Sequence, residues 1–311
     1  MKYVFLIVSL FLTCTTASGQ IVVRGGTVGT AVATPKGLEK NTPVEGKEID
    51  KSKVVVVYSY SCKTQNADGQ DVTDRSRFVL QVGNKVNKFY PYDQYLQNFE
   101  FEKVTDKNLS MEDLSTARSL SIPDVWTNYP EGKVTTRDAI FPNFYETETK
   151  KPTIKWDLKD GTSEQCGYTC NEAECEFHGK SWKVYYTEEI PTTAGPWKLG
   201  GLPGLIVSAT DAEGIHQFKL ELLENVSTPI LLETVASVIK VSEKKLMDYK
   251  KEIYGNPKYL KDAYHYVPDW QSHIESLQVF QPSKGTGTIS VNDGKFFLPT
   301  EPHAYQPLEL Q

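Results

Sequence analysis

Residues 195–211 read GPWKLGGLPGLIVSATD, and this stretch decides how the chain is predicted to bend. Its glycines allow backbone angles and close backbone packing that other residues cannot adopt. Pro203 fixes one φ angle and removes one N–H donor. We therefore interpret the stretch as a structural turn that leads into a strand. The glycines concerned are Gly200, Gly201 and Gly204.

Apolar side chains of the same stretch are predicted to anchor this turn in the core. They are Trp197, Leu202, Leu205 and Ile206, and Trp182 and Phe218 of the flanking segments are expected to join them. The alternative is a phosphate cradle, because glycine-rich loops bind phosphate where several N–H groups converge at a helix start. No helix signal follows this loop and it lacks the lysine of a phosphate-binding loop, so the structural interpretation is favoured.

Segments rich in β-branched and aromatic residues flank the turn on both sides, a pattern typical of strands. Turn signals such as Asp160-Gly161 separate them. Helices are expected over 93–104, 111–120 and 242–254, the last one capped by Ser242. The predicted strands are 54–60, 78–82, 85–90, 135–141, 144–149, 153–158, 182–187, 204–209 and 215–223.

We predict an α+β fold, in which a curved, mainly antiparallel sheet (half-barrel or bowl-like) is wrapped around one or more helices. The curvature is expected from the glycines in and between the strands. One domain is predicted over 51–285. A Gly- and Pro-rich extension over 20–50 is expected to be flexible, and 286–311 to form a tail.

Residues 1–19 are predicted to be a secretory signal peptide. A basic residue is followed by the apolar run 4–12, which is shorter than the about 20 residues that a membrane-spanning helix needs. Ala17 and Gly19 fit the small positions before a cleavage site. A lipid on Cys14 is the less favoured alternative. The mature chain is expected in the periplasm or at the outer membrane, with no transmembrane segment.

Composition and charge limit the class of partner. The net charge of −6 argues against nucleic acid, because binding to phosphates requires clustered Lys and Arg. No G-x-S-x-G elbow and no H-E-x-x-H motif is present. Acidic pairs such as Glu188-Glu189 and Glu172 with Glu174 are expected to be solvated. We expect no cofactor and favour a non-enzymatic role over an enzyme of unseen mechanism.

Four of the five cysteines remain once Cys14 has left with the signal peptide. An even number in an exported chain predicts two disulfides, with three possible connectivities among which the sequence does not choose. The four are Cys62, Cys166, Cys170 and Cys175.

A metal site is the alternative role of these cysteines. Together with His178, the last three spell C-x3-C-x4-C-x2-H, a set of ligands suited to Zn²⁺ or copper. The spacing is not that of a standard zinc finger, and disulfide formation competes in an oxidising compartment. The metal site at Cys166, Cys170, Cys175 and His178 is therefore less favoured.

Residues 201–206 spell GLPGLI, and the surrounding motifs extend the pattern. Glu189-Ile190-Pro191 and Gly195-Pro196-Trp197-Lys198 precede the hexapeptide, and an early hairpin carries LQVG at 80–83 and KFY at 88–90. On these motifs, over about residues 50–260, the chain resembles the GLPGLI family of Gram-negative bacteria.

The resemblance implies an exported envelope protein of unassigned activity, which we interpret as a non-catalytic binding or assembly module for an envelope protein, a peptide or a glycan. A weaker likeness to the bowl-shaped N-terminal domain of secreted deglycosylating enzymes implies no activity, since that domain is not catalytic. The chain departs from the family at Lys180-Ser181, where a Gly-Arg type pair is usual, and in having cysteines besides Cys170. The alternative function is metal handling by the cysteine cluster.

Overall fold

The structure, a computed structural model, describes most of the chain between 45 and 256 and four shorter parts outside it. The predicted signal peptide at 1–19, the predicted helix at 111–120 and most of the extension at 20–50 lie outside the described residues. Those described are 22–24, 45–66, 68–99, 122–140, 143–235, 238–256, 287–291, 294–298 and 303–310.

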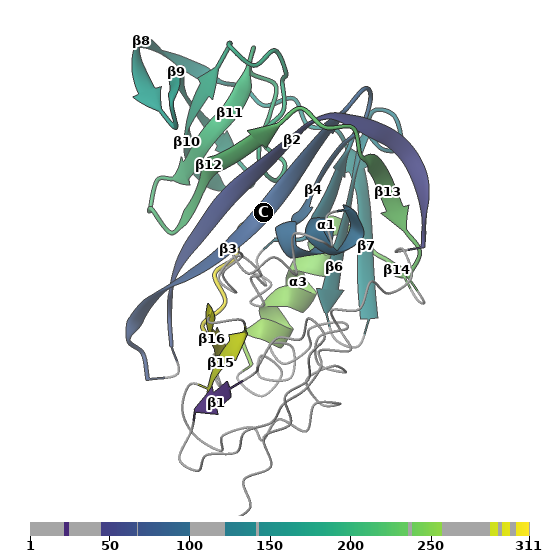
Figure 1. The fold of residues 1–311 in the computed structure, drawn as a ribbon, viewed down its shortest axis with the longest axis vertical. Coiled ribbons are helices and arrows are strands. Elements are labelled where there is room, and N and C mark those ends of the chain that lie inside the picture. Colours follow the sequence, from purple (N-terminus) through teal and green to yellow (C-terminus); the bar gives the residue numbers. More distant parts are fainter. Residues whose placement is uncertain are drawn as a thin grey trace, which may run out of the picture.

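One large open sheet of thirteen strands dominates the described residues (Figure 1). Neighbouring strands are antiparallel except β14 and β7, which are parallel. The spatial order is β14 (Val238–Lys240), β7 (Asn143–Lys150), β6 (Lys133–Ile140), β5 (Asp124–Thr127), β4 (Asn87–Pro91), β3 (Asp71–Gly83), β2 (Gly46–Gln65), β12 (His216–Glu224), β11 (Leu205–Asp211), β10 (Lys180–Thr187), β9 (Tyr168–Phe177) and β8 (Asp157–Gln165).

Two smaller parts complete the strands. β13 (Pro229–Glu233) pairs with the first residues of β2, so β2 begins at Gly46, within the extension that was predicted to be flexible. A separate three-stranded sheet consists of β1 (Val22–Arg24), β15 (Gly287–Val291) and β16 (Gly294–Leu298).

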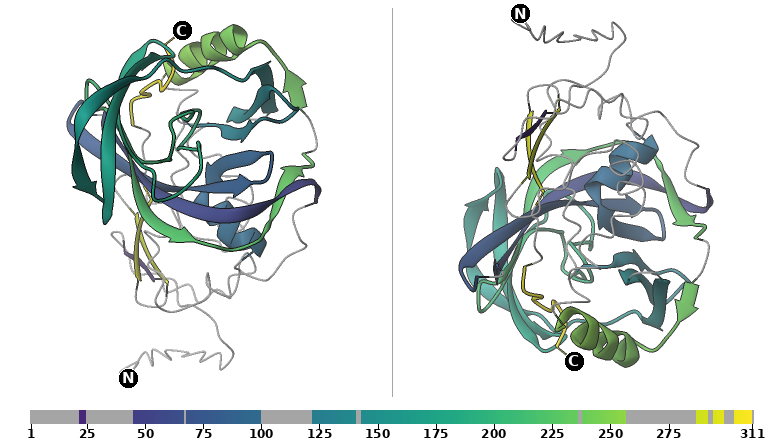
Figure 2. Two further views of the ribbon diagram at one scale, coloured as in Figure 1. Left: turned by 90° about the horizontal axis from the view of Figure 1, so that it is seen from above. Right: turned by 90° about the horizontal axis from the view of Figure 1, so that it is seen from below.

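The predicted α+β class, with the sheet wrapped around helices, is wrong. The described residues are mostly strand. Helix α1 (Tyr92–Phe99) packs on β3 and β4, and α3 (Glu243–Tyr254) packs on β7 near one edge of the curved sheet (Figure 2). The loop between β10 and β11 lies on the concave side instead (Figure 2). Helix α3 does not fill the concave side because its apolar stripe is narrow. Its buried residues Leu246 and Tyr254 belong to a small cluster apart from the main core.

The main core takes its side chains from β2, β3, β4 and β9–β12, together with the loop between β10 and β11. All six side chains predicted for the core are buried, among them Trp197 at 1% and Ile206 at 0% exposure. The hydroxyl of Tyr58 on β2 donates to the carbonyl of Ile206 over 2.6 Å, which ties the loop's strand to the middle of the sheet.

The predicted strand at 153–158 is wrong, because residues 151–156 form no regular structure and β8 begins at Asp157. Strand β8 has no buried residue, so it lacks the alternation of apolar and polar side chains that marks a half-buried strand. The helix over 242–254 is confirmed as α3, and its cap Ser242 accepts a hydrogen bond from the backbone of Lys245.

None of the helices in the described part of the chain has the length and apolar character needed to cross a membrane.

Candidate binding site beneath the glycine-rich loop

Residues 193–201 form a small hairpin that hangs from the sheet into its concave side. The backbone N–H of Gly201 donates to the carbonyl of Thr193 over 2.8 Å, and Ala194 bridges Gly200. Trp197 stands at the tip with a φ of 55°, a left-handed conformation that is uncommon for a bulky residue. The carbonyl of Ala194 then accepts from the backbone N–H of Ile206, which fixes the hairpin to β11.

Two glycines of the hexapeptide lie in different structural environments. A Cβ atom at Gly204 would lie 2.2 Å from the carbonyl oxygen of Thr187, so the close approach of two backbones requires glycine there. Gly201 has a φ of +93° and nothing closer than the indole nitrogen of Trp156, at 3.9 Å, beside its missing side chain. Gly204 is therefore a packing residue, whereas Gly201 presents backbone to open space.

An aromatic cluster holds the tip of the hairpin in place. The ring of Trp197 lies 5.5 Å from Phe177, 5.8 Å from Trp182 and 5.6 Å from His178 between centroids. Such tilted arrangements add about 0.5–1.5 kcal/mol per pair beyond the burial of area. The indole nitrogens of Trp197 and Trp182 are buried without a hydrogen-bond partner, so the cluster fixes the loop by packing alone.

A cavity of about 220 Å³ lies between this hairpin and residues 151–154. The backbone of Gly200 and Gly201 forms one wall, and the indole N–H of Trp156 donates to the carbonyl of Gly200 over 3.1 Å. The polar side chains of the lining are Asn87, Thr127, Lys151, Thr153, Thr193 and Lys198. The cavity therefore offers hydroxyl, amide and ammonium groups to a small polar group.

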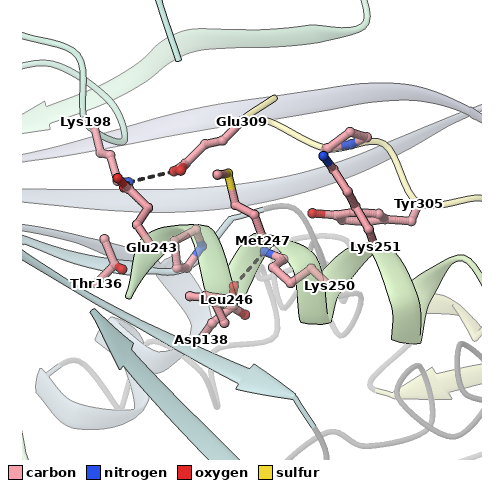
Figure 3. A pocket seen from close by; sticks show the side chains of 12 residues that line it. Thr136, Asp138, Lys198, Glu243, Leu246, Met247, Lys250, Lys251, Tyr305 and Glu309 are labelled. Atoms are coloured by element: carbon pink, nitrogen blue, oxygen red, sulfur yellow. Dashed lines mark hydrogen bonds and ion pairs between the residues drawn. The ribbon is translucent and has the colours of Figure 1, made fainter. Parts of the chain in front are cut away.

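Lys198 lines both this cavity and a second, smaller one beside α3 (Figure 3). Its ammonium lies 2.6 Å from Glu243 and 2.7 Å from Glu309. Burial alone lowers the pKa of Lys198, but the two carboxylates outweigh it and raise the pKa above the ordinary value. Lys198 is therefore a buried cation that is already paired with two anions.

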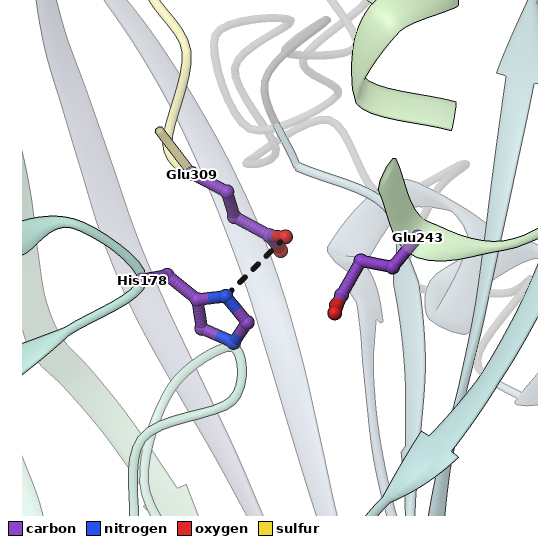
Figure 4. A group of neighbouring side chains, drawn as sticks. All are labelled: His178, Glu243 and Glu309. Carbon is purple, nitrogen blue, oxygen red and sulfur yellow. Dashed lines mark ion pairs between the residues drawn. The ribbon is translucent and has the colours of Figure 1, made fainter. Parts of the chain in front are cut away.

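His178, Glu243 and Glu309 are the one group of potential metal ligands that converges within the described residues (Figure 4). Their ligand atoms all lie within 4.8 Å of one another. The ammonium of Lys198 binds both carboxylates, so a divalent cation would have to displace a positive charge that already compensates them. The group is an ion-pair cluster in this structure.

The four residues predicted as an alternative metal site are spread along β9. Cys166 precedes the strand and His178 follows it, both in turns with positive φ. A strand of this length spans roughly 33 Å at about 3.3 Å per residue. The structure therefore does not bring Cys166, Cys170, Cys175 and His178 together as one ligand set.

All four predicted disulfide cysteines are free thiols in the structure. Burial raises the pKa of Cys62 and Cys170 to about 11 and that of Cys175 to about 12, so these thiols are protonated at neutral pH. Strands β10, β11 and β12 separate Cys62 from the cysteines of β9, a distance of about 19 Å along the sheet at about 4.8 Å per strand. A disulfide needs Cα atoms within about 7 Å, so the fold brings neither within reach of Cys62.

The acidic pairs behave as solvated faces. Glu172 pairs with Lys183 and Glu174 with Lys159, all on the outside of β8–β10. Two partly buried acids that the sequence interpretation missed are Glu243 and Glu309 of the Lys198 cluster, whose side chains are 25% and 14% exposed. Their only local signal was Lys198 inside an apolar motif, since a buried lysine requires an acidic partner.

The comparisons with known proteins are sparse. The sequence matches no family profile, and no curated protein is similar to it. Two solved structures of PNGF-II, in space groups P21 and C2, share 11% sequence identity with the chain, with TM-scores of 0.43 and 0.36. They cover 64% and 62% of this chain but 32% of their own, so the chain spans about a third of their length. A likeness of this degree supports no statement about function.

Proposed function

We propose that this chain is an exported, GLPGLI-like envelope protein that acts as a non-catalytic binding module and holds one sugar unit of a glycan. The observation that carries the proposal is the cavity under residues 193–201. Its volume of about 220 Å³ is below the range of about 300–1,000 Å³ that is typical of pockets for whole drug-sized ligands. It suits a single ring or side chain at the end of a larger partner.

A sugar fits the chemistry of the lining better than a lone ion does. Thr153 and Thr193 offer hydroxyls that both donate and accept, and the side-chain amide of Asn87 also has a donor and an acceptor. The one buried cation of the lining, Lys198, is already paired with carboxylates. Neutral hydroxyl groups can exchange hydrogen bonds with this lining at no cost in charge burial.

An oligosaccharide array tests the proposal. The purified protein should bind a subset of the glycans, and a Thr153→Val/Thr193→Val variant should lose that binding while it keeps the same melting temperature. Thr162→Val is the matched control, because Thr162 is exposed on β8 outside the cavity lining and should leave binding unchanged. Absence of binding by the wild-type chain, or equal binding by the double variant, contradicts the proposal.

Export of the chain to the periplasm or the outer membrane is a separate part of the proposal. Support comes from the basic start, the apolar run and the small residues of the first 19 positions. N-terminal sequencing of the protein recovered from the periplasm or outer membrane should begin at Gln20. Recovery of the intact N-terminus from the cytosol would contradict export.

A further inference from the structure

Residues 303–310, called the strap below, return to the domain and lie along it as an extended segment (Figures 1 and 2). The first part is fixed to the far end of β2. The backbone N–H of Ala304 donates to the carbonyl of Gln65 over 2.7 Å, and the hydroxyl of Thr64 donates to the carbonyl of Ala304. The ring of His303 pairs with the carboxylate of Asp74.

Two contacts hold the middle of the strap: a ring contact of Tyr305 and a hydrogen bond to the backbone of Pro307. The ring of Tyr305 packs on Tyr254 of α3 at 4.9 Å between centroids, with the ammonium of Lys250 5.7 Å from its centre. The Nε2 atom of His216 lies 3.2 Å from the carbonyl oxygen of Pro307. Because a carbonyl only accepts, Nε2 carries the proton and donates, and Nδ1 accepts from the hydroxyl of Tyr60.

The last part of the strap places an apolar and an acidic side chain in separate sites. Leu308 is 1% exposed and belongs to the main core. The carboxylate of Glu309 binds the buried ammonium of Lys198 at 2.7 Å (Figure 3). The backbone N–H of Leu310 donates to the carbonyl of His178 over 2.9 Å.

These contacts have the character of a peptide in a binding groove. Backbone hydrogen bonds at both ends fix an extended segment, whose Tyr305 packs on α3, whose Leu308 enters the main core and whose Glu309 pairs with Lys198. The groove itself is built from β2, β12, the β9–β10 turn, α3 and the hairpin 193–201. Residues 257–302 stand between α3 and the strap in the sequence, so the groove is assembled from elements remote from the segment that fills it.

We propose that this groove is a binding site for the peptide pattern Tyr-x-Pro-Leu-Glu, occupied in cis by residues 303–310 and open to the same segment of a second copy of the chain. The strap of the same chain is tethered beside the groove and therefore has a high effective concentration. In the wild-type chain it outcompetes the strap of a second copy. Exchange of an identical segment between two copies preserves every contact, so it is a low-cost route to a dimer. This inference goes beyond the proposed sugar site and does not depend on it.

The test uses the full chain and a labelled synthetic peptide of residues 303–310. In the variant Leu308→Ala/Glu309→Gln the strap loses its apolar and acidic anchors, whereas every residue of the groove is retained. The wild-type peptide should bind this variant at least about tenfold more tightly than it binds the wild-type chain, because the cis competitor is weakened. A control peptide with the same two substitutions should bind neither protein.

A second measurement keeps the test decisive if the double variant is unstable. Excess wild-type peptide should raise the melting temperature of Glu309→Gln and should speed hydrogen exchange of the strap amides in the wild-type chain, as the tethered copy is displaced. Equal binding of both peptides, or no effect of the peptide on melting and exchange, would show that the strap is a fixed part of the fold and would overturn the proposal. Neither outcome bears on binding of oligosaccharides.

Discussion

The ammonium of Lys198 lies 2.7 Å from the carboxylate of Glu309, and this ion pair joins the glycine-rich hairpin to the strap. The carboxylate of Glu243 on α3 lies 2.6 Å from the same ammonium. Three parts of the chain that are remote in sequence therefore meet at one buried cation. The pair lies between the two cavities, so it also separates the proposed sugar site from the strap.

Removal of the Lys198 charge should destabilise the protein strongly. In Lys198→Met the carboxylate of Glu309, which is 14% exposed, would lose its buried cation, and Glu243, 25% exposed, can turn to solvent. Breaking a fully buried pair costs about 3–5 kcal/mol, which is the upper bound of the expected loss. Urea denaturation measures the loss. Lys183→Met is the matched control, because the Lys183–Glu172 pair is solvent-exposed and such pairs contribute about 0–1 kcal/mol. Similar losses in the two variants would contradict a buried, strongly coupled cluster.

Gly204→Val should be among the most damaging single substitutions in the hexapeptide. The new Cβ would lie 2.2 Å from the carbonyl oxygen of Thr187, so one of the two backbones must move. Overpacking of this kind typically costs about 1–3 kcal/mol and more where the obstacle is backbone. A thermal melt checks the prediction. Gly132→Asn should be mild in comparison, since nothing lies within 4 Å of its added Cβ and asparagine tolerates the positive φ.

His216 should make the protein less stable in acid. Burial lowers the pKa of His216 from 6.5 to about 4, so between these values the unfolded chain binds a proton that the folded chain does not. Stability therefore rises with pH across this window, and falls by up to about 3 kcal/mol on acidification at 1.36 kcal/mol per pKa unit.

His303 acts in the opposite direction, because its hydrogen bond with Asp74 raises its pKa and this contribution is lost as the pH rises. Unfolding free energies of wild type and His216→Gln at several pH values separate the two effects. The difference between the proteins should shrink from pH 7 towards pH 4, and a constant difference would exclude His216 as the source.

The thiols should differ in reactivity in the folded protein. Cys166 is half-exposed, whereas burial raises the pKa of Cys175 to about 12, so iodoacetamide should modify Cys166 first and Cys175 last. Intact mass after alkylation of the unfolded, unreduced chain decides the disulfide prediction. Two disulfides would leave no thiol to label, and one of them would have to include Cys62, which three strands separate from the cysteines of β9.

The burial of the apolar side chains in the glycine-rich stretch could be predicted because the information for it is local. Close packing at Gly204, the fixed φ of Pro203 and burial of Leu205 and Ile206 all follow from residue types within a few positions of one another. The same holds for α3, whose cap Ser242 and apolar spacing are contiguous. The fold class was wrong because propensity identifies a helix but not what it packs against.

The sequence by itself determined the turn, most of the strands and their buried side chains, since alternation and backbone restrictions act over a few residues. Only the tertiary structure decided that a loop, not a helix, lies in the bowl, that Lys198 meets Glu243 and Glu309, and that the cysteines of β9 stay apart from Cys62. The physical reason is that charge pairing and groove filling depend on distances between segments that the curvature of one large sheet brings together or keeps apart.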